Sequence, residues 1–218
     1  MANYRAELAV AIFAVVVLVG YVVMLGSVGP RPAPGDLAIG PASPIGVPRP
    51  PVERAVYLVP IGDFPREAAD ALVAHYFEKF GLAIEVLPSI PVPAGAMDAE
   101  RQQLIAERLL DAIAASETVA GDPDAVVIGL TDVDMYIAAR TWGYAYGLRS
   151  GGTQAVVSSA RMDDGFATEE RRQQRLRKMV TKNIGILYYG LGVSDDPRSV
   201  LYRDILGPDD LDYASEDF

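Results

Sequence analysis

Residues 125–130, AVVIGL, constrain the fold more than any other segment, because none of their side chains is polar. A strand with one face in water alternates apolar and polar residues, whereas an unbroken apolar run is typical of a strand that is buried on both faces. We therefore expect this run to be an interior strand of a sheet that is covered on both sides.

Short apolar runs and amphipathic stretches alternate before this strand. We expect strands at 55–60 and 83–87 and helices at 65–80 and 98–115. The first helix has one apolar stripe at helical spacing, formed by Ala69, Leu72, Val73, Tyr76 and Phe80. The order strand, helix, strand, helix, strand predicts an α/β (α+β) domain with right-handed crossovers and a twisted, mainly parallel sheet packed on helices.

Residues 144–149 and 154–160 are separated by Ser-Gly-Gly, which favours an antiparallel hairpin at the edge of the sheet. An edge strand offers unpaired backbone groups to an extended peptide, so a binding groove is possible there. Alternatively, a loop or a partner covers this edge.

The segment 168–191 begins with polar residues and ends with apolar ones, and we expect it to form a helix that packs in the core. Its apolar positions follow at steps of three and four and are Leu176, Val180, Ile184, Leu187 and Leu191. Lys182 interrupts this half, and a buried lysine needs a partner or an exit to water. The candidate partners are Asp132, Asp134, Asp195 and Asp196, but we expect Lys182 to be solvated instead.

Six motifs follow one another in an order that suggests a known family. They are VYLVPIG at 56–62, ERQQ at 100–103, VIGLTDVDMY at 127–136, WGYAYG at 142–147, AVVSSARM at 155–162, and RLRKMVTKNIGILYYGLGVSDDPRSVL at 175–201. Together they resemble the archaemetzincins, a family of metzincin zinc proteases, over residues 56–213. The resemblance implies a metzincin-like domain in which the hairpin borders the substrate cleft.

The same resemblance implies where the zinc ligands of the family would fall. These positions are Lys182 for the first ligand, Ile186 or Leu187 for the second, Val193 for the third, Asn183 for the general base and Leu201 for the Met-turn methionine. Aliphatic side chains have no lone pair, and an amide does not take up a proton at neutral pH. We therefore expect a degenerate family member with no catalytic residues, no metal and no cofactor.

The counts of histidine and cysteine also predict that the chain binds no zinc. The chain has one histidine, His75, and no cysteine, so neither a multi-histidine site nor the family's second, cysteine-based site can form. The cysteines of that second site would fall on Ser194 and Ser199. Ser158 and Ser159 have no accompanying histidine with which to form a Ser-His-Asp triad, and the acidic residues near the C-terminus lack EF-hand spacing.

The N-terminal region predicts membrane attachment. After a tail at 1–7, residues 8–28 carry no charge and would span about 30 Å as a helix, which is the thickness of a bilayer core. A cleaved signal peptide is the alternative. Residues 29–53 are rich in Pro and Gly and indicate an extended linker to a soluble domain at 54–218.

These observations predict a single-pass protein of the bacterial inner membrane, with its C-terminal domain outside the cytoplasm. A net charge of −10 argues against nucleic acid as a partner. The functional hypothesis is that the chain is not an enzyme but a structural or accessory subunit docked on a membrane protein complex. The alternatives are a membrane-anchored peptidase and a pseudoenzyme that binds peptides in the old substrate cleft.

Overall fold

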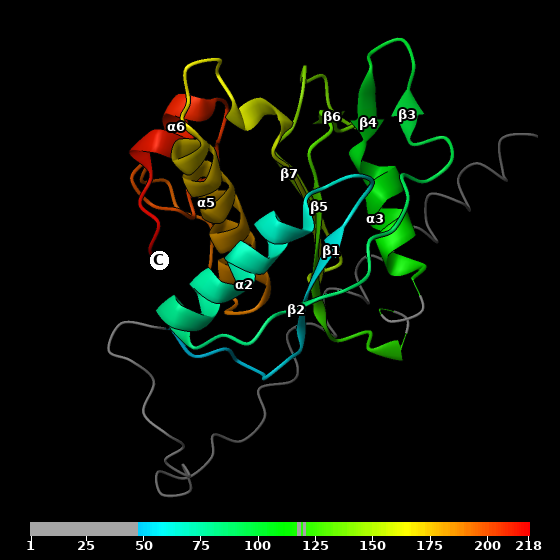
Figure 1. The fold of residues 1–218 in the computed structure, drawn as a ribbon. Helices are drawn as coiled ribbons and strands as arrows, with labels where there is room; N and C mark the ends of the chain where they lie inside the picture. Colours follow the sequence, from blue (N-terminus) through cyan, green and yellow to red (C-terminus); the bar gives the residue numbers. More distant parts are fainter. Residues whose placement is uncertain (1–47, 117–118, 120) are drawn as a thin grey trace, which may run out of the picture. The chain divides into compact units, whose positions relative to one another are not determined.

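The computed structural model describes residues 48–116, 119 and 121–218. They form an α/β domain around a five-stranded sheet (Figure 1), which has the order β2-β1-β5-β8-β7. The strands are β1 (Val56–Pro60), β2 (Glu85–Val86), β5 (Val126–Thr131), β7 (Gly147–Ser150) and β8 (Gln154–Ser158). The first four in the sheet order are parallel and β7 is antiparallel, which confirms the prediction of a mainly parallel sheet with an antiparallel edge strand.

All six residues of β5 are buried, as its apolar sequence predicts. Val126, Ile128 and Leu130 belong to the core on one face of the sheet, and Val127 belongs to the core on the other. Gly129 allows close packing here, because a Cβ atom at this position would lie 2.5 Å from Ile113 Cδ1. The central strand is therefore covered on both sides.

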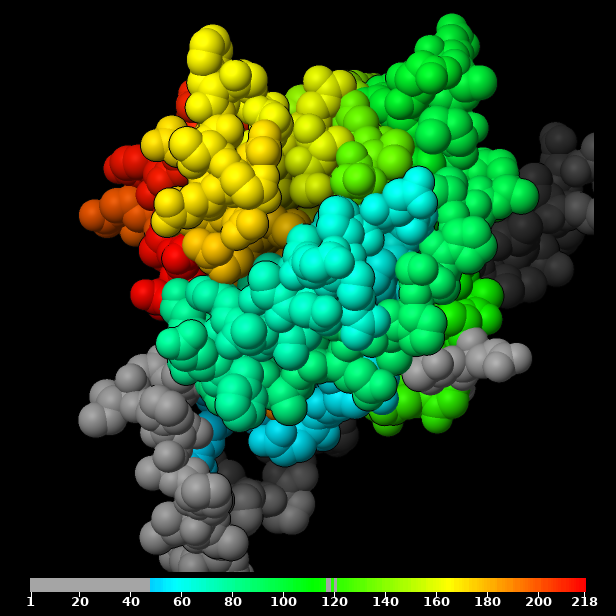
Figure 2. Space-filling view, in the orientation of Figure 1, coloured from blue at the N-terminus to red at the C-terminus, as the bar shows by residue number. Residues whose placement is uncertain are grey.

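Helices cover the sheet on both faces (Figure 1). They are α2 (Arg66–Phe80), α3 (Ala106–Ala114), the short 3₁₀ helix η1 (Ala160–Met162), α5 (Glu169–Leu187) and α6 (Pro208–Tyr213). Helices α2 and α5 share one core, whereas α3 contributes to the other. Figure 2 shows α2 and α5 in contact on one surface, where the Tyr76 hydroxyl donates to the Arg177 carbonyl across 2.8 Å.

The prediction of a helix from residue 98 is wrong in its first part. Residues 97–105 instead form β3 (Met97–Asp98) and β4 (Gln103–Ile105), which make a second sheet with β6 (Met135–Tyr136). The Asp98 carboxylate accepts hydrogen bonds from the backbone N–H groups of Glu100 and Arg101 and so closes a turn. Gln102 has φ of 54°, which is incompatible with a right-handed helix, and α3 begins only at Ala106.

The tail at 1–7 and the apolar segment at 8–28 lie outside the described residues, as does most of the linker at 29–53. Within the described part of the chain, none of the helices combines the length and the apolar character that crossing a bilayer requires. The membrane anchor therefore stays a prediction.

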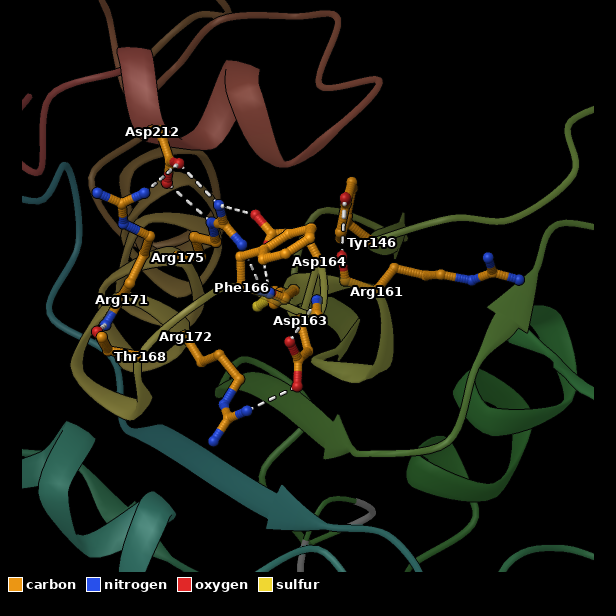
Figure 3. A network of polar contacts seen from close by, with 12 residues as sticks. Tyr146, Arg161, Asp163, Asp164, Phe166, Thr168, Arg171, Arg172, Arg175 and Asp212 are labelled. Atoms are coloured by element: carbon orange, nitrogen blue, oxygen red, sulfur yellow. Dashed lines mark hydrogen bonds and ion pairs between the residues drawn. The ribbon is translucent and has the colours of Figure 1, made fainter.

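Arg175 links α5 to two other segments (Figure 3). Its side chain is 1% exposed and donates to both carboxylate oxygens of Asp212 on α6, to Asp164 and to the Met162 carbonyl. These bonds raise the pKa of Arg175 and lower that of Asp212. Nearby, the Lys178 ammonium donates to the Leu211 carbonyl across 2.7 Å. The polar half of α5 therefore fixes α6 and the loop after η1.

We expect Arg175→Met to lower the free energy of unfolding by about 3 kcal/mol or more. The change removes the hydrogen-bond donor of two carboxylates and one backbone carbonyl. The matched control is Arg108→Met, since Arg108 is 63% exposed and lies 3.8 Å from Asp111. That change should cost about 0–1 kcal/mol. Urea unfolding of the full-length chain in detergent measures both values, and equal losses would contradict the assigned role of Arg175.

Candidate functional site

A cleft of about 550 Å³ opens beside the edge strand β7. Residues 143–149 form one side, residues 203–206 form another, and Met179 and Lys182 of α5 complete the lining between them. Trp142 and Leu206 belong to the same lining and are 53% and 71% exposed. The site thus combines the predicted edge strand with the half of α5 to which the resemblance assigns the family's metal positions.

The outer edge of β7 has free backbone groups that face away from the sheet. The Ser158 N–H donates to the Tyr146 carbonyl across 3.0 Å, at the start of the pairing between β7 and β8. Ladder bonds in an antiparallel pair alternate along the strand, so the N–H and C=O groups of Gly147 and Arg149 point away from β8. No other strand in the described residues pairs with this edge, which agrees with the hairpin prediction.

The opposite wall, residues 203–206, is held by polar contacts. The Asp210 carboxylate accepts from the N–H groups of Leu206 and Gly207 at 2.8 and 3.0 Å. The Tyr144 hydroxyl donates to the Leu206 carbonyl across the cleft lining. Since α6 follows directly, the bond between Arg175 and Asp212 also fixes this wall in place.

Lys182 is only 5% exposed, and its ammonium donates to the backbone carbonyls of Tyr202 and Arg203. The favoured expectation of a solvated lysine is therefore wrong, and none of the four candidate aspartates forms an ion pair with Lys182. Asp134, Asp195 and Asp196 instead pair with three arginines, which are Arg161, Arg203 and Arg198. Burial lowers the pKa of Lys182 to about 8, with a further contribution from the positive charge of Arg149.

Asn183 links α5 to β7. Its side-chain amide donates to the Met179 carbonyl across 2.8 Å, and its oxygen accepts from Nη1 of Arg149 across 3.2 Å. The amide is 1% exposed and both of its polar ends are used. Asn183 therefore orients Arg149 in the cleft, a role that its sequence position did not indicate.

The other positions implied by the resemblance do not line the cleft. Ile186 is half-buried, Leu187 and Leu201 are buried, and Val193 is 48% exposed. Leu201 lies against Gly185, where an added Cβ would be 2.9 Å from its Cδ2 atom. Of this set, only Lys182 reaches the cleft.

Comparison with known proteins identifies relatives of this chain. An archaemetzincin from Natronomonas pharaonis is 32% identical over 158 residues, which cover 67% of this chain and 84% of that protein. An archaemetzincin from Haloarcula marismortui is 30% identical over 158 residues, which again cover 67% of this chain and 84% of that protein. The chain belongs to the archaemetzincin family.

A solved structure agrees with this assignment. The archaemetzincin from Methanopyrus kandleri matches with a TM-score of 0.61 and 27% identity, over 76% of this chain and 89% of that one. No family model matches the sequence. The predicted resemblance and the metzincin-like α/β fold are both confirmed.

Two predictions must be corrected in the light of these relatives. We predicted that the chain is not an enzyme and that it serves as an inactive subunit of a membrane complex. Its relatives are archaemetzincins, and none of them is described as an accessory subunit. Compared with this family relationship, the missing metal ligands are weak evidence that the chain is inactive. Neither prediction is therefore kept.

The residues of this chain nevertheless do not fit the zinc of the family. Lys182, which the resemblance aligns with the first ligand, is a cation and already donates to two backbone carbonyls. The single histidine, His75, lies on α2 and does not line the cleft. Within residues 48–116, 119 and 121–218, no three His, Cys, Asp or Glu side chains gather into a group that could hold a metal ion.

Sequence reasoning missed Trp142, Arg149 and Arg203 as residues of the site. Trp142 was noticed only as part of a family motif, and Arg149 only as the end of a predicted edge strand. The sequence places both residues at or next to the predicted edge strand. Side chains at the end of an edge strand lie beside the open edge of the sheet, so this position could have indicated that they belong to the site. Nothing in the sequence connects Arg203 with the cleft.

Lys182 predicts a pH dependence of stability. Its pKa is about 8 in the folded chain and 10.5 in the absence of perturbation, so the unfolded chain binds more protons between these values. The free energy of unfolding should therefore rise with pH in this window, relative to Lys182→Met. Arg149 lowers this pKa, Asp204 opposes the shift, and Arg203 also lines the cleft.

Urea unfolding of the full-length chain and of Lys182→Met at several pH values between 7 and 10.5 tests this expectation. The difference in free energy between the two proteins isolates Lys182, because the buried tyrosines titrate in both. A difference that stays constant over the window would contradict the burial of a charged Lys182.

Proposed function

We propose that this archaemetzincin acts on peptides and binds an extended segment along the outer edge of β7. The observation that carries the proposal is the free edge at Gly147 and Arg149, which opens into a cleft of about 550 Å³. Peptides are the ligand class that family membership favours, and strand addition to a sheet edge is a common way of binding them.

The cleft offers both kinds of contact that this mode of binding uses. Backbone groups of Gly147 and Arg149 are available for ladder hydrogen bonds, which depend little on peptide sequence. Trp142 and Leu206 present exposed apolar surface that would contact peptide side chains. All of these groups belong to the protein itself, so binding requires no zinc at the positions of Lys182 and Asn183.

Trp142→Ala should weaken peptide binding by about tenfold, because a partly exposed tryptophan at a cleft rim is a typical anchor for a ligand. The matched control is Phe166→Ala, since Phe166 is 96% exposed and does not line the cleft. Its affinity should equal that of the unchanged chain. Fluorescence anisotropy with a labelled pool of random peptides of about ten residues, on full-length protein in detergent, measures the affinities.

Two further readouts sharpen this experiment. Mass spectrometry of the same samples reports whether the bound peptides are cleaved, and EDTA should leave the affinity unchanged. Absence of saturable binding, or an equal loss in Trp142→Ala and Phe166→Ala, would overturn the proposal.

The apolar segment at 8–28 supports a second proposal, that it anchors the domain in the bacterial inner membrane. The linker at 29–53 would then hold the domain outside the cytoplasm, at a distance from the bilayer. We expect the full-length chain to stay in membranes washed with alkaline carbonate. We also expect a protease added to spheroplasts to digest the domain.

Replacing residues 8–28 with a cleavable signal peptide provides the control, and this variant should be released in soluble form. Release of the unchanged chain by carbonate would contradict the anchor. Protection from the added protease would contradict the orientation.

A further inference from the structure

Lys182 brings a positive charge to the cleft. Its ammonium has three N–H groups, and the bonds to the Tyr202 and Arg203 carbonyls use two of them. No carboxylate of the described residues pairs with it. The two carbonyls stabilise the ammonium through hydrogen bonds but do not neutralise its charge, so an anion is favoured beside it.

Arg149 adds a second cation from the neighbouring strand β7. Its only hydrogen bond within the described residues runs from Nη1 to the Asn183 amide oxygen, and it forms no ion pair there. Because that amide is fixed by the Met179 carbonyl, the guanidinium is held in the cleft while its remaining N–H groups stay available. An arginine fork suits the two oxygens of a carboxylate.

The charge of the cleft is opposite to that of the whole chain. Four cationic residues and one acidic residue line it, although the net charge of the chain is −10. Arg203 is neutralised by Asp195 across 2.6 Å, and Arg140 lies over the Trp142 ring at the rim. Asp204 is the one acidic residue of the lining, and it partly offsets the positive charge around Lys182. Lys182 and Arg149 carry the cationic groups inside the cleft that form no ion pair within the described residues.

We propose that Lys182 and Arg149 form a carboxylate-binding subsite, which makes acidic peptides the preferred ligands of this cleft. The inference rests on the proposed function and specifies its ligand class. A peptide lying along β7 passes beside Arg149, because this residue supplies both an outward backbone group and the guanidinium. The carboxylate comes from a Glu or Asp side chain or from a free C-terminus.

Three peptides of about ten residues and otherwise equal sequence separate these sources. One has a central Glu and an amidated C-terminus, one has Gln and an amidated C-terminus, and one has Gln and a free C-terminus. We expect one of the two carboxylate peptides to bind the full-length chain about tenfold more tightly than the neutral peptide, since hydrogen bonds between charged groups contribute most.

Arg149→Gln should remove most of this preference and keep the fold, because Arg149 lies at the protein surface. Lys182→Met should remove it as well, with circular dichroism to verify folding. Arg108→Gln changes an exposed arginine outside the cleft and should leave the preference intact.

The possible failures are distinguishable. Equal affinity for all three peptides overturns the carboxylate subsite and leaves peptide binding in place. A preference that survives in Arg149→Gln also overturns it. Absence of binding by every peptide overturns both proposals.

Discussion

The buried guanidinium of Arg175 is the interaction on which the architecture of the site depends. It joins α5 to α6 and to the loop after η1 through charge-assisted hydrogen bonds. Removing such a group from water is costly, and only a full set of acceptors compensates for that cost. Because residues 203–206 lead directly into α6, the geometry of Arg175 also sets the wall that faces β7. Arg175 thus helps to hold one wall of the cleft, together with the hydrogen bonds of Asp210 and Tyr144.

The two halves of helix α5 make different kinds of contact. Its first half is polar and connects segments through Arg175 and Lys178, whereas its second half packs on the sheet. Within that second half lie Lys182 and Asn183, which the family resemblance aligns with a zinc ligand and the general base, and both form hydrogen bonds within the protein itself. The ammonium binds backbone carbonyls and the amide orients Arg149, so the polar groups of this helix remain satisfied without a metal.

The sheet could be predicted from the sequence because burial on both faces leaves a strong local pattern, as in β5. The hairpin could be predicted because its turn residues are local as well. The start of α3 could not, since Asp98 closes a turn with two N–H groups and competes with the helix that its neighbours favour. The hydrogen-bond acceptors of Lys182 could not be predicted from the sequence either, because they are backbone carbonyls, which every residue has.

By itself, the sequence determined the class of the fold, the family and the lack of histidines and cysteines for zinc, because each of these follows from local patterns or from counting. Only the tertiary structure decided which charges share the cleft. Lys182 and Arg149 are 33 positions apart, and they meet because the packing of α5 beside the sheet brings them to one place. Long-range proximity of this kind results from the folded arrangement of helices and strands. For that reason the positive cleft of an acidic protein became visible only in three dimensions.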